Sequence, residues 1–357
     1  MEDKDFLGYF SKLGPPSSVE EVKSAAGKIV NTLVAISGVK GADNKASESA
    51  TAAMKAKYLT GDLGEKMSAD LNYTLKRLVR GLYSENHSVK QGFFISSVLV
   101  LNRFKSQIDF EKYLKHVFSE TKVNQGMKSS EAHNMSLGRM MCLSACIEAR
   151  VFISSAAQQV NQRTLKAMVG CLVELFNSSE FLQESIVAVL AKLLTSLKDH
   201  RQVGLSALEI IVETLITGRS EGSVDFKSNI LSSSNKLSLY LRLKEVYHAY
   251  YSGQSKEFEE VFAYKVLSSD KQNLKLIQGL ISRQTYLYPR LHSCIGLLMS
   301  EISREEKVTD RARLAQQFLT TILTDHLFNE ETYQGMKSTA KFKFLYIGLS
   351  MWKLAAT

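Results

Sequence analysis

Apolar residues recur at every third or fourth position along most of this chain, the spacing that places side chains on one face of an α-helix. The segment 70–101 shows the pattern best. A leucine stripe opens it, and a second apolar stripe follows Ser84 and Asn86, either of which can cap a new helix. Gly92 has no side chain and should mark the point where the two helices approach closely. We therefore predict a helical hairpin that buries Leu71, Leu75, Leu78, Leu82, Val89, Phe93, Val98 and Leu101.

The same spacing predicts helices along the rest of the chain, joined by short polar connections. Near the start, Gly14, Pro15 and Pro16 separate a short amphipathic helix from a longer one that Ser17 or Ser18 can cap. Outside the hairpin, the predicted helices cover about 5–13, 18–37, 110–119, 131–150, 161–176, 180–197, 201–217, 236–251, 256–267, 271–287, 289–303, 308–325 and 331–353.

Two segments lack the helical pattern. Residues 38–68 are small, polar and rich in glycine, which predicts a flexible insertion. Residues 218–235 are rich in serine and predict a second loop. We otherwise expect one helical-repeat domain over 1–357.

The fold class predicted is all-α, because helix pairs follow one another and each pair can bury only one stripe. Such pairs must stack on their neighbours, which is how an α-solenoid of HEAT/armadillo-like helix pairs is built. No sequence period is strict enough to name the repeat, and a globular helical bundle is the alternative.

The charge of the chain is uneven. It holds 45 Lys and Arg residues against 36 Asp and Glu residues, a net charge of +9, and residues 71–130 contain ten basic and four acidic residues. A concentrated excess of positive charge favours an anionic partner, whereas the alternative is a solvated lysine-rich surface.

If this stretch binds RNA or DNA phosphate, its cations are the candidate site. The alternative is that several of them are structural, because a guanidinium can bind the last carbonyls of a neighbouring helix or pair with Glu131 or Asp109. That alternative is strongest for Arg77 and Arg80. The candidate nucleic-acid-binding residues are Lys76, Arg77, Arg80, Lys90, Arg103, Lys105, Lys128 and Arg139.

No motif in the chain indicates an enzyme. Cys142 and Cys146 are one helical turn apart, but no His or Cys pair stands at zinc-site spacing from them, so we expect them in the core. Gly27 and Lys28 resemble the end of a phosphate-binding loop that lacks its partner glycine and its Ser or Thr. We predict a non-enzymatic protein of a reducing compartment, with no cofactor, no bound metal, no membrane span and no small-molecule substrate.

The hairpin segment DLNYTLKRLVRGLYSENHSVKQGFF resembles the signature of the DNA polymerase phi / Myb-binding protein family, which includes the fungal "DNA polymerase V" type. Lys90 stands where the family has Arg, and His133 and Asn134 stand where charged residues are expected. The residues that match are Tyr73, Leu75, Lys76, Arg77, Leu78, Arg80, Gly81, Leu82, Ser84, Gly92 and Phe93, then Gly126, Met127, Lys128, Glu131, Gly138 and Arg139.

This resemblance is close over about 70–150, and it implies a helical-repeat protein of the nucleus and nucleolus. Members act in ribosomal RNA gene transcription and large-subunit assembly, so the implied partners are pre-ribosomal RNA or rDNA and ribosome-assembly or transcription proteins. Members are longer and carry charged tails, which implies that this chain is a fragment or a reduced form. The alternative function is a helical-repeat adaptor or transcription co-regulator that does not bind nucleic acid.

Overall fold

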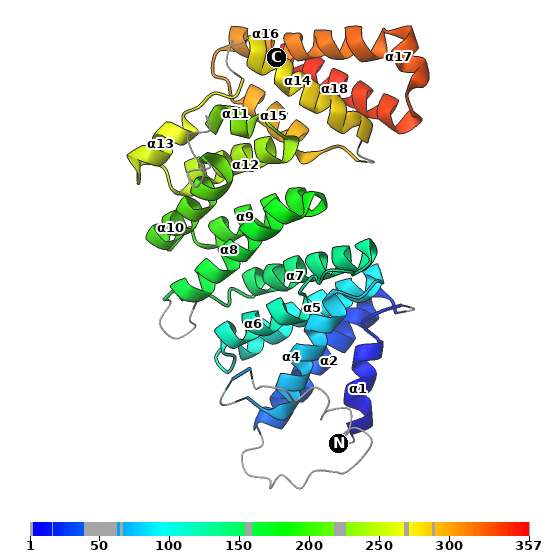
Figure 1. Ribbon diagram of the computed structural model, residues 1–357, viewed down its shortest axis with the longest axis vertical. Helices are drawn as coiled ribbons and strands as arrows, with labels where there is room; N and C mark the ends of the chain where they lie inside the picture. The colour runs from blue at the N-terminus through cyan, green and yellow to red at the C-terminus, as the bar shows by residue number, and fades with distance from the viewer. Residues whose placement is uncertain are drawn as a thin grey trace. The chain divides into compact units, whose positions relative to one another are not determined.

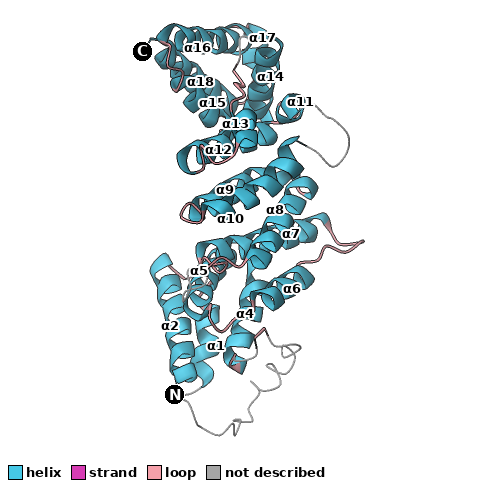
Figure 2. Cartoon of the chain, turned by 90° about the vertical axis from the view of Figure 1, so that its left-hand side faces the viewer, coloured by secondary structure: helices cyan, strands magenta, loops and turns pink. Residues whose placement is uncertain are grey.

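The computed structural model describes residues 3–15, 17–38, 63, 64, 67–153, 159–217, 226–267, 271–287 and 290–356. These residues form helices and loops (Figure 2), and the only β-pairing among them is an isolated antiparallel bridge between Ile153 and Val160. The all-α prediction is therefore confirmed, while the solenoid arrangement stays a prediction. No helix in the described ranges is long and apolar enough to cross a membrane.

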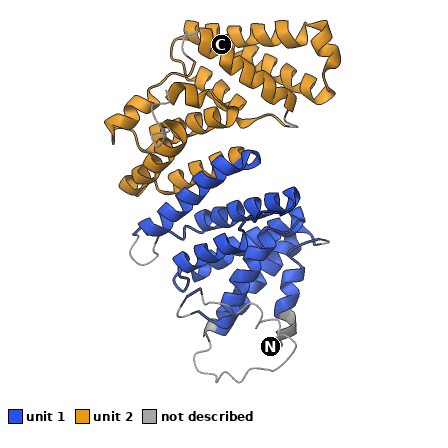
Figure 3. Cartoon of the chain, in the orientation of Figure 1, with its two compact units in different colours: residues 1–182 blue, residues 183–357 orange. Residues whose placement is uncertain are grey.

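The chain divides into two compact units, residues 1–182 and 183–357 (Figure 3). One repeat domain over 1–357 stays a prediction. The helices of the first unit (Figure 1) are α1 (Asp3–Ser11), α2 (Val19–Gly38), α4 (Ala69–Leu82), α5 (His87–Phe104), α6 (Phe110–Glu120), α7 (Ser129–Glu148), α8 (Gln162–Ser178) and the 3₁₀ turn η1 (Glu180–Leu182).

The predicted hairpin is α4 and α5, which pack against each other. Ser68 caps α4, since its side chain accepts a hydrogen bond from Leu71 N at 3.2 Å. Asn86, one of the two predicted caps, begins α5, and its Oδ1 accepts from Ser88 N at 2.9 Å. These side chains satisfy backbone donors that have no partner within the first turn of a helix.

Helix α4 is buried on nearly all sides, because α5, α6 and α7 all pack on it. The predicted stripe Leu71, Leu75, Leu78 and Leu82 is buried, and so are Tyr73, Val79 and Lys76 on its other faces. In α5, Phe93 and Leu101 are buried as predicted, whereas Val89 and Val98 are half-buried.

Gly92 is a point of close approach, but its neighbour differs from the one predicted. A Cβ on Gly92 would lie 1.9 Å from Leu13 O, so this glycine admits the chain segment between α1 and α2. The tight contact between α4 and α5 is made at Gly81, where a Cβ would lie 1.9 Å from the ring of Phe93. The prediction that Gly92 is the point of close packing between the two hairpin helices was therefore wrong, since the sequence pattern does not show a third segment at this point.

The second unit continues with α9 to α18. Its core includes Tyr240, Tyr247 and Phe262, whose rings stack with centroids 4.9–5.9 Å apart. The elements are α9 (Gln183–Ser196), α10 (Arg201–Ile211), the π-helix η2 (Val212–Thr217), α11 (Phe226–Ile230), α12 (Ser234–Tyr250), α13 (Lys256–Phe262), α14 (Lys271–Leu287), α15 (Ser293–Ser303), α16 (Val308–Ile322), the π-helix η3 (Leu323–Leu327), α17 (Glu330–Gly335) and α18 (Ser338–Ala356).

Several predicted boundaries are corrected. The loop predicted over 218–235 contains α11, and its last residues begin α12; residues 218–225 lie outside the described part. The helix predicted over 331–353 is two helices, because the chain is extended at Met336. The helix predicted over 289–303 begins at Ser293, and that over 256–267 ends at Phe262. Most of the predicted insertion 38–68 lies outside the described residues.

Candidate nucleic-acid interface

Lys76 and Arg77, the first two predicted cations, face the interior of the first unit. Lys76 is only 2% exposed. Arg77 donates a hydrogen bond to Tyr73 Oη at 2.7 Å, and its guanidinium lies 4.3 Å from the centroid of the Phe10 ring. A cation over an aromatic face is attracted by the negative face of the ring. Arg77 therefore fastens α1 to α4.

Arg80 is held by Glu120 of α6. Its Nε donates to Glu120 Oε2 at 3.0 Å and its Nη2 to Oε1 at 3.4 Å, while Tyr83 Oη donates to the same carboxylate. Burial alone would raise the pKa of Glu120, but the hydrogen bond and charge of Arg80, together with the charge of His116 and the hydrogen bond from Tyr83, hold this pKa below its usual value. Arg80 thus has the predicted kind of structural partner, but the acid is Glu120 and neither Glu131 nor Asp109.

Lys90 is buried between α5 and α7. It is 4% exposed, and its Nζ donates a hydrogen bond to Asn134 Oδ1 at 2.7 Å. Burial lowers the pKa of the Lys90 ammonium, because a charged group loses its hydration there. Lys90 therefore joins two helices and does not lie on an open surface.

Arg139 of α7 supports the end of α6. Its Nε donates to Thr121 Oγ1 at 3.0 Å and its Nη2 to Thr121 O at 2.9 Å, and Thr121 is the residue that ends α6. Carbonyls at the end of a helix lack partners within the helix, so a cationic donor stabilises them. The sequence analysis left this role open as the alternative for Arg77 and Arg80; the structure shows it at Arg139.

The remaining three predicted cations, Arg103, Lys105 and Lys128, have no hydrogen bond or ion pair from their side chains to any described residue. Arg103 and Lys105 lie together at the end of α5. Lys128 directly precedes α7. Asn134, in the second turn of α7, contacts Lys90 near the start of α5. Lys128 is thus near the other end of α5, a helix about 27 Å long, so the predicted basic edge is divided.

Arg103 and Lys105 line a hollow between α2 and α5 with a volume of about 530 Å³. The hollow has a basic and polar rim, to which Asn31, Asn102 and Ser106 contribute amide and hydroxyl groups. Val30 and Leu99 add apolar surface, and Gly27 leaves space because it has no side chain. This arrangement offers two unpaired cations and several neutral hydrogen-bonding groups to a phosphate and the sugar or base attached to it.

The contribution of α2 to this hollow was not predicted from the sequence. Gly27, Val30 and Asn31 are spaced three and four residues apart, so they share one face of α2. Gly27 and Lys28 drew attention only as part of a phosphate loop, a motif that is incomplete here. The sequence does place Gly27 and the polar Asn31 one helical turn apart. However, only the packing of α2 against α5 shows that they line a hollow.

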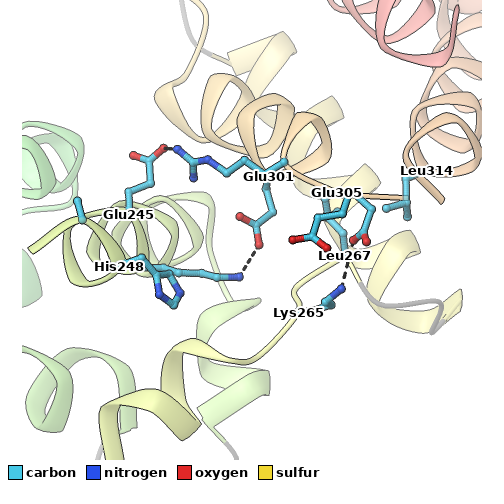
Figure 4. A pocket seen from close by; sticks show the side chains of 11 residues that line it. Glu245, His248, Lys265, Leu267, Glu301, Glu305 and Leu314 are labelled. Atoms are coloured by element: carbon cyan, nitrogen blue, oxygen red, sulfur yellow. Dashed lines mark hydrogen bonds and ion pairs between the residues drawn. The ribbon is translucent and has the colours of Figure 1, made fainter. Parts of the chain in front are cut away.

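A second hollow, of about 640 Å³, lies within the second unit between α12, α15 and the segment after α13. Its charged groups are paired with one another (Figure 4): Lys244 with Glu301, Arg304 with Glu245, and Lys265 with Glu305. The positive charges are therefore largely neutralised by adjacent carboxylates. This hollow has little attraction for an anionic ligand, and its ion pairs tie α12 to α15.

The cysteines lie in the core, as predicted. Cys142 and Cys146 are buried, and burial raises the pKa of the Cys146 thiol to about 12 and that of Cys142 well above its usual value, so both stay protonated at neutral pH. In the described ranges, no group of three or more His, Cys, Asp or Glu side chains could hold a metal ion.

Comparison with known proteins identifies a family. The family model described as DNA polymerase phi matches residues 73–341 of the 357, a range that begins at the first Tyr of the hairpin signature and enters both compact units. The match extends well beyond the segment 70–150 in which the sequence resemblance is close. No curated protein and no solved structure matches the chain.

Proposed function

This chain belongs to the DNA polymerase phi family, and from that premise we propose that it is a non-enzymatic helical-repeat scaffold that acts in ribosome biogenesis or ribosomal RNA gene transcription. The family indicates a nuclear protein, and the proposed site of action is the nucleolus. The proposed mechanism is binding alone: one surface binds the phosphates of pre-ribosomal RNA or rDNA, and other surfaces bind ribosome-assembly or transcription proteins.

The observation that carries the nucleic-acid half is the hollow between α2 and α5. Arg103 and Lys105 have no acidic partner among the described residues, and Asn31, Asn102 and Ser106 line the same hollow with neutral donors and acceptors. Cations without a protein partner are the ones that can release counterions from a nucleic acid when they bind it. By contrast, the other five predicted cations are buried or bonded within the protein: Lys76, Arg77, Arg80, Lys90 and Arg139.

The test is RNA binding by the full chain at two salt concentrations. The Arg103→Ala/Lys105→Ala variant should bind RNA of any sequence more weakly than the parent does. The slope of log K against log salt concentration should fall by about two, because two phosphates are no longer neutralised. The Lys166→Ala/Lys198→Ala variant is the matched control, because it removes two exposed cations, one on α8 and one in the turn after α9. Its salt slope should equal that of the parent. Equal binding by the parent and the first variant at about 150 mM salt would refute a phosphate site in this hollow.

The family name contains the word polymerase, whereas we propose that this chain has no polymerase activity. Nucleotidyl transfer of the polymerase type needs carboxylates that hold two metal ions, and the described residues contain no group of three or more His, Cys, Asp or Glu side chains that could hold a metal ion. A primer-extension assay with purified protein tests this point. We expect no extension with magnesium or manganese, and template-dependent extension would overturn the non-enzymatic proposal.

A helical-repeat adaptor or transcription co-regulator without nucleic-acid binding is the second candidate. It is favoured by the five predicted cations that are bonded within the protein or buried. The salt-dependence experiment separates the two, since an adaptor should show no slope that depends on Arg103 and Lys105. Affinity purification from cells tests the nucleolar role: pre-ribosomal RNA and ribosome-assembly proteins should co-purify with the chain.

A further inference from the structure

The last helix of the second unit, α18, is apolar on two opposite faces. One face packs on α16 and α14 (Figure 1). This face buries Ala340, Phe344, Ile347 and Met351. The opposite face is exposed, although its residues are also large and apolar. This exposed stripe consists of Phe342, Leu345, Tyr346, Leu349 and Trp352, which are 42–73% exposed.

The members of the exposed stripe follow steps of three and four, so they form a continuous band along the helix axis. Single exposed apolar residues are common on protein surfaces, but five in one band are not. From Phe342 to Trp352 the band is about 15 Å long, which is about three helical turns. A helix of about 11–14 residues would cover it.

The charges around the stripe indicate the chemistry of its partner. Residues 332–357 contain four lysines and no Asp or Glu. Lys341 lies at one end of the stripe, with its Nζ 4.2 Å from the centroid of the Tyr333 ring, and Lys353 lies at the other end. A partner helix with acidic residues beside its apolar face would therefore be complementary in both shape and charge.

A second copy of the chain is a poorer occupant of the stripe. If two copies of α18 met face to face in antiparallel fashion, Lys341 of each would approach Lys353 of the other; in a parallel pair, each lysine would approach its own counterpart. Neither arrangement supplies a carboxylate from α18, and like charges close together are unfavourable.

We propose that the exposed stripe of α18 is a docking surface for an acidic amphipathic helix of a partner protein. This inference deepens the protein-binding half of the proposed function and rests on it. It is independent of the nucleic-acid half, because the stripe belongs to the second unit and the hollow of Arg103 and Lys105 to the first.

The chain contains a built-in reporter for this surface, since Trp352 is its only tryptophan. The probe is a synthetic helical peptide of about 14 residues without aromatic residues, with leucines at helical spacing and glutamates on both flanks. Its binding to the full chain should shift the Trp352 emission to shorter wavelength and protect it from iodide quenching. The control peptides replace every glutamate by lysine, or every leucine by glutamine, and should produce neither effect.

A variant outside the reporter tests the position of the site. Leu349→Gln keeps Trp352 and should weaken peptide binding about tenfold or more, as expected for a residue in the middle of an interface. Val123→Gln changes an exposed apolar residue of the first unit and should leave peptide binding unchanged. RNA binding is measured on the same preparations. Leu349→Gln should not alter RNA binding. The docking proposal can therefore fail while the nucleic-acid proposal stands, and the nucleic-acid proposal can fail while the docking proposal stands.

Four results would overturn the docking proposal. The acidic peptide could leave the Trp352 emission unchanged, or the lysine peptide could bind equally well. The emission could shift with protein concentration alone, which would assign the stripe to a second copy. It could instead shift only with vesicles of anionic lipid, which would assign the stripe to a membrane surface.

Discussion

Lys90 and Asn134 are joined by a hydrogen bond of 2.7 Å from Nζ to Oδ1, across 44 residues of sequence. The resemblance to the family signature leads us to expect Arg at position 90 and a charged residue at position 134, where this chain has Lys and Asn. These two positions therefore meet in one part-buried contact between α5 and α7.

This pair should behave as a unit in stability measurements. Asn134→Leu leaves the buried ammonium of Lys90 without its acceptor and should lower the free energy of unfolding by about 1–3 kcal/mol. Lys90→Met/Asn134→Leu removes both partners and should be less destabilised than the sum of the two single variants, with a coupling of about 0.5–3 kcal/mol. Urea unfolding of the four proteins measures this cycle. Strict additivity would show that the contact contributes nothing.

Arg139 should prove structural although it is one of the predicted nucleic-acid-binding residues. Arg139→Met removes two hydrogen bonds to Thr121 at the end of α6 and should cost about 1–3 kcal/mol. The folded variant should keep the salt slope of RNA binding, because Arg139 contacts protein and not phosphate. Thermal unfolding and filter binding on one preparation check both statements. A reduced slope with unchanged stability would return Arg139 to the nucleic-acid interface.

His116 should make the first unit sensitive to mild acid. Burial lowers its pKa below 6.5, and the nearby charges of Lys76 and Arg80 lower it further, although Glu120 acts in the opposite direction. The unfolded chain therefore binds a proton before the folded chain does, and stability falls as the pH decreases from about 7 to about 5. Carboxylates whose pKa values are lowered in the folded protein, such as Glu120, also contribute to stability. Their contribution is lost only at lower pH, where they become protonated.

His116→Leu should make the decline of stability between about pH 7 and pH 5 shallower. It should leave stability at pH 7 equal or higher, because the buried Nε2 has no hydrogen-bond partner in the described structure. His87→Leu is the control, since His87 is exposed and should leave the pH profile unchanged. Profiles that are identical for the parent and His116→Leu would contradict the assignment.

Two glycines inside helices should respond oppositely to the same substitution. Gly92→Ala places a Cβ against Leu13 O and should destabilise by about 1–3 kcal/mol. Gly170 of α8 has no atom within 4 Å of such a Cβ, so Gly170→Ala should stabilise by up to about 1 kcal/mol. Melting temperatures provide the comparison. An unchanged melting temperature for Gly92→Ala would mean that Leu13 can move away freely.

Much of the helical pattern could be predicted because it depends on near neighbours in sequence. The leucines of α4 and the cap at Asn86 were found from spacing and residue type alone. The errors fall where a local pattern was continued too far. The pattern over 331–353 predicts one helix, but the chain is extended at Met336 and forms separate helices before and after it. Similarly, a serine-rich stretch concealed α11.

The roles of the cations could not be predicted, because they depend on residues far away in sequence. Arg80 finds its carboxylate 40 residues later and Lys90 its amide 44 residues later. A helical wheel places Lys76 away from the leucine stripe, yet α4 is covered on several sides and Lys76 is buried. The hollow of Arg103 and Lys105 requires α2, which the linear charge count does not include.

The sequence by itself determined that this protein is built of helices, where most of them begin, and which family it resembles, because caps and the 3.6-residue period act within a few residues. Only the tertiary structure decided which cations are used to hold helices together and which remain open to a ligand. That choice depends on whether a carboxylate, carbonyl or amide is brought within hydrogen-bonding distance, and packing between distant segments alone sets that distance.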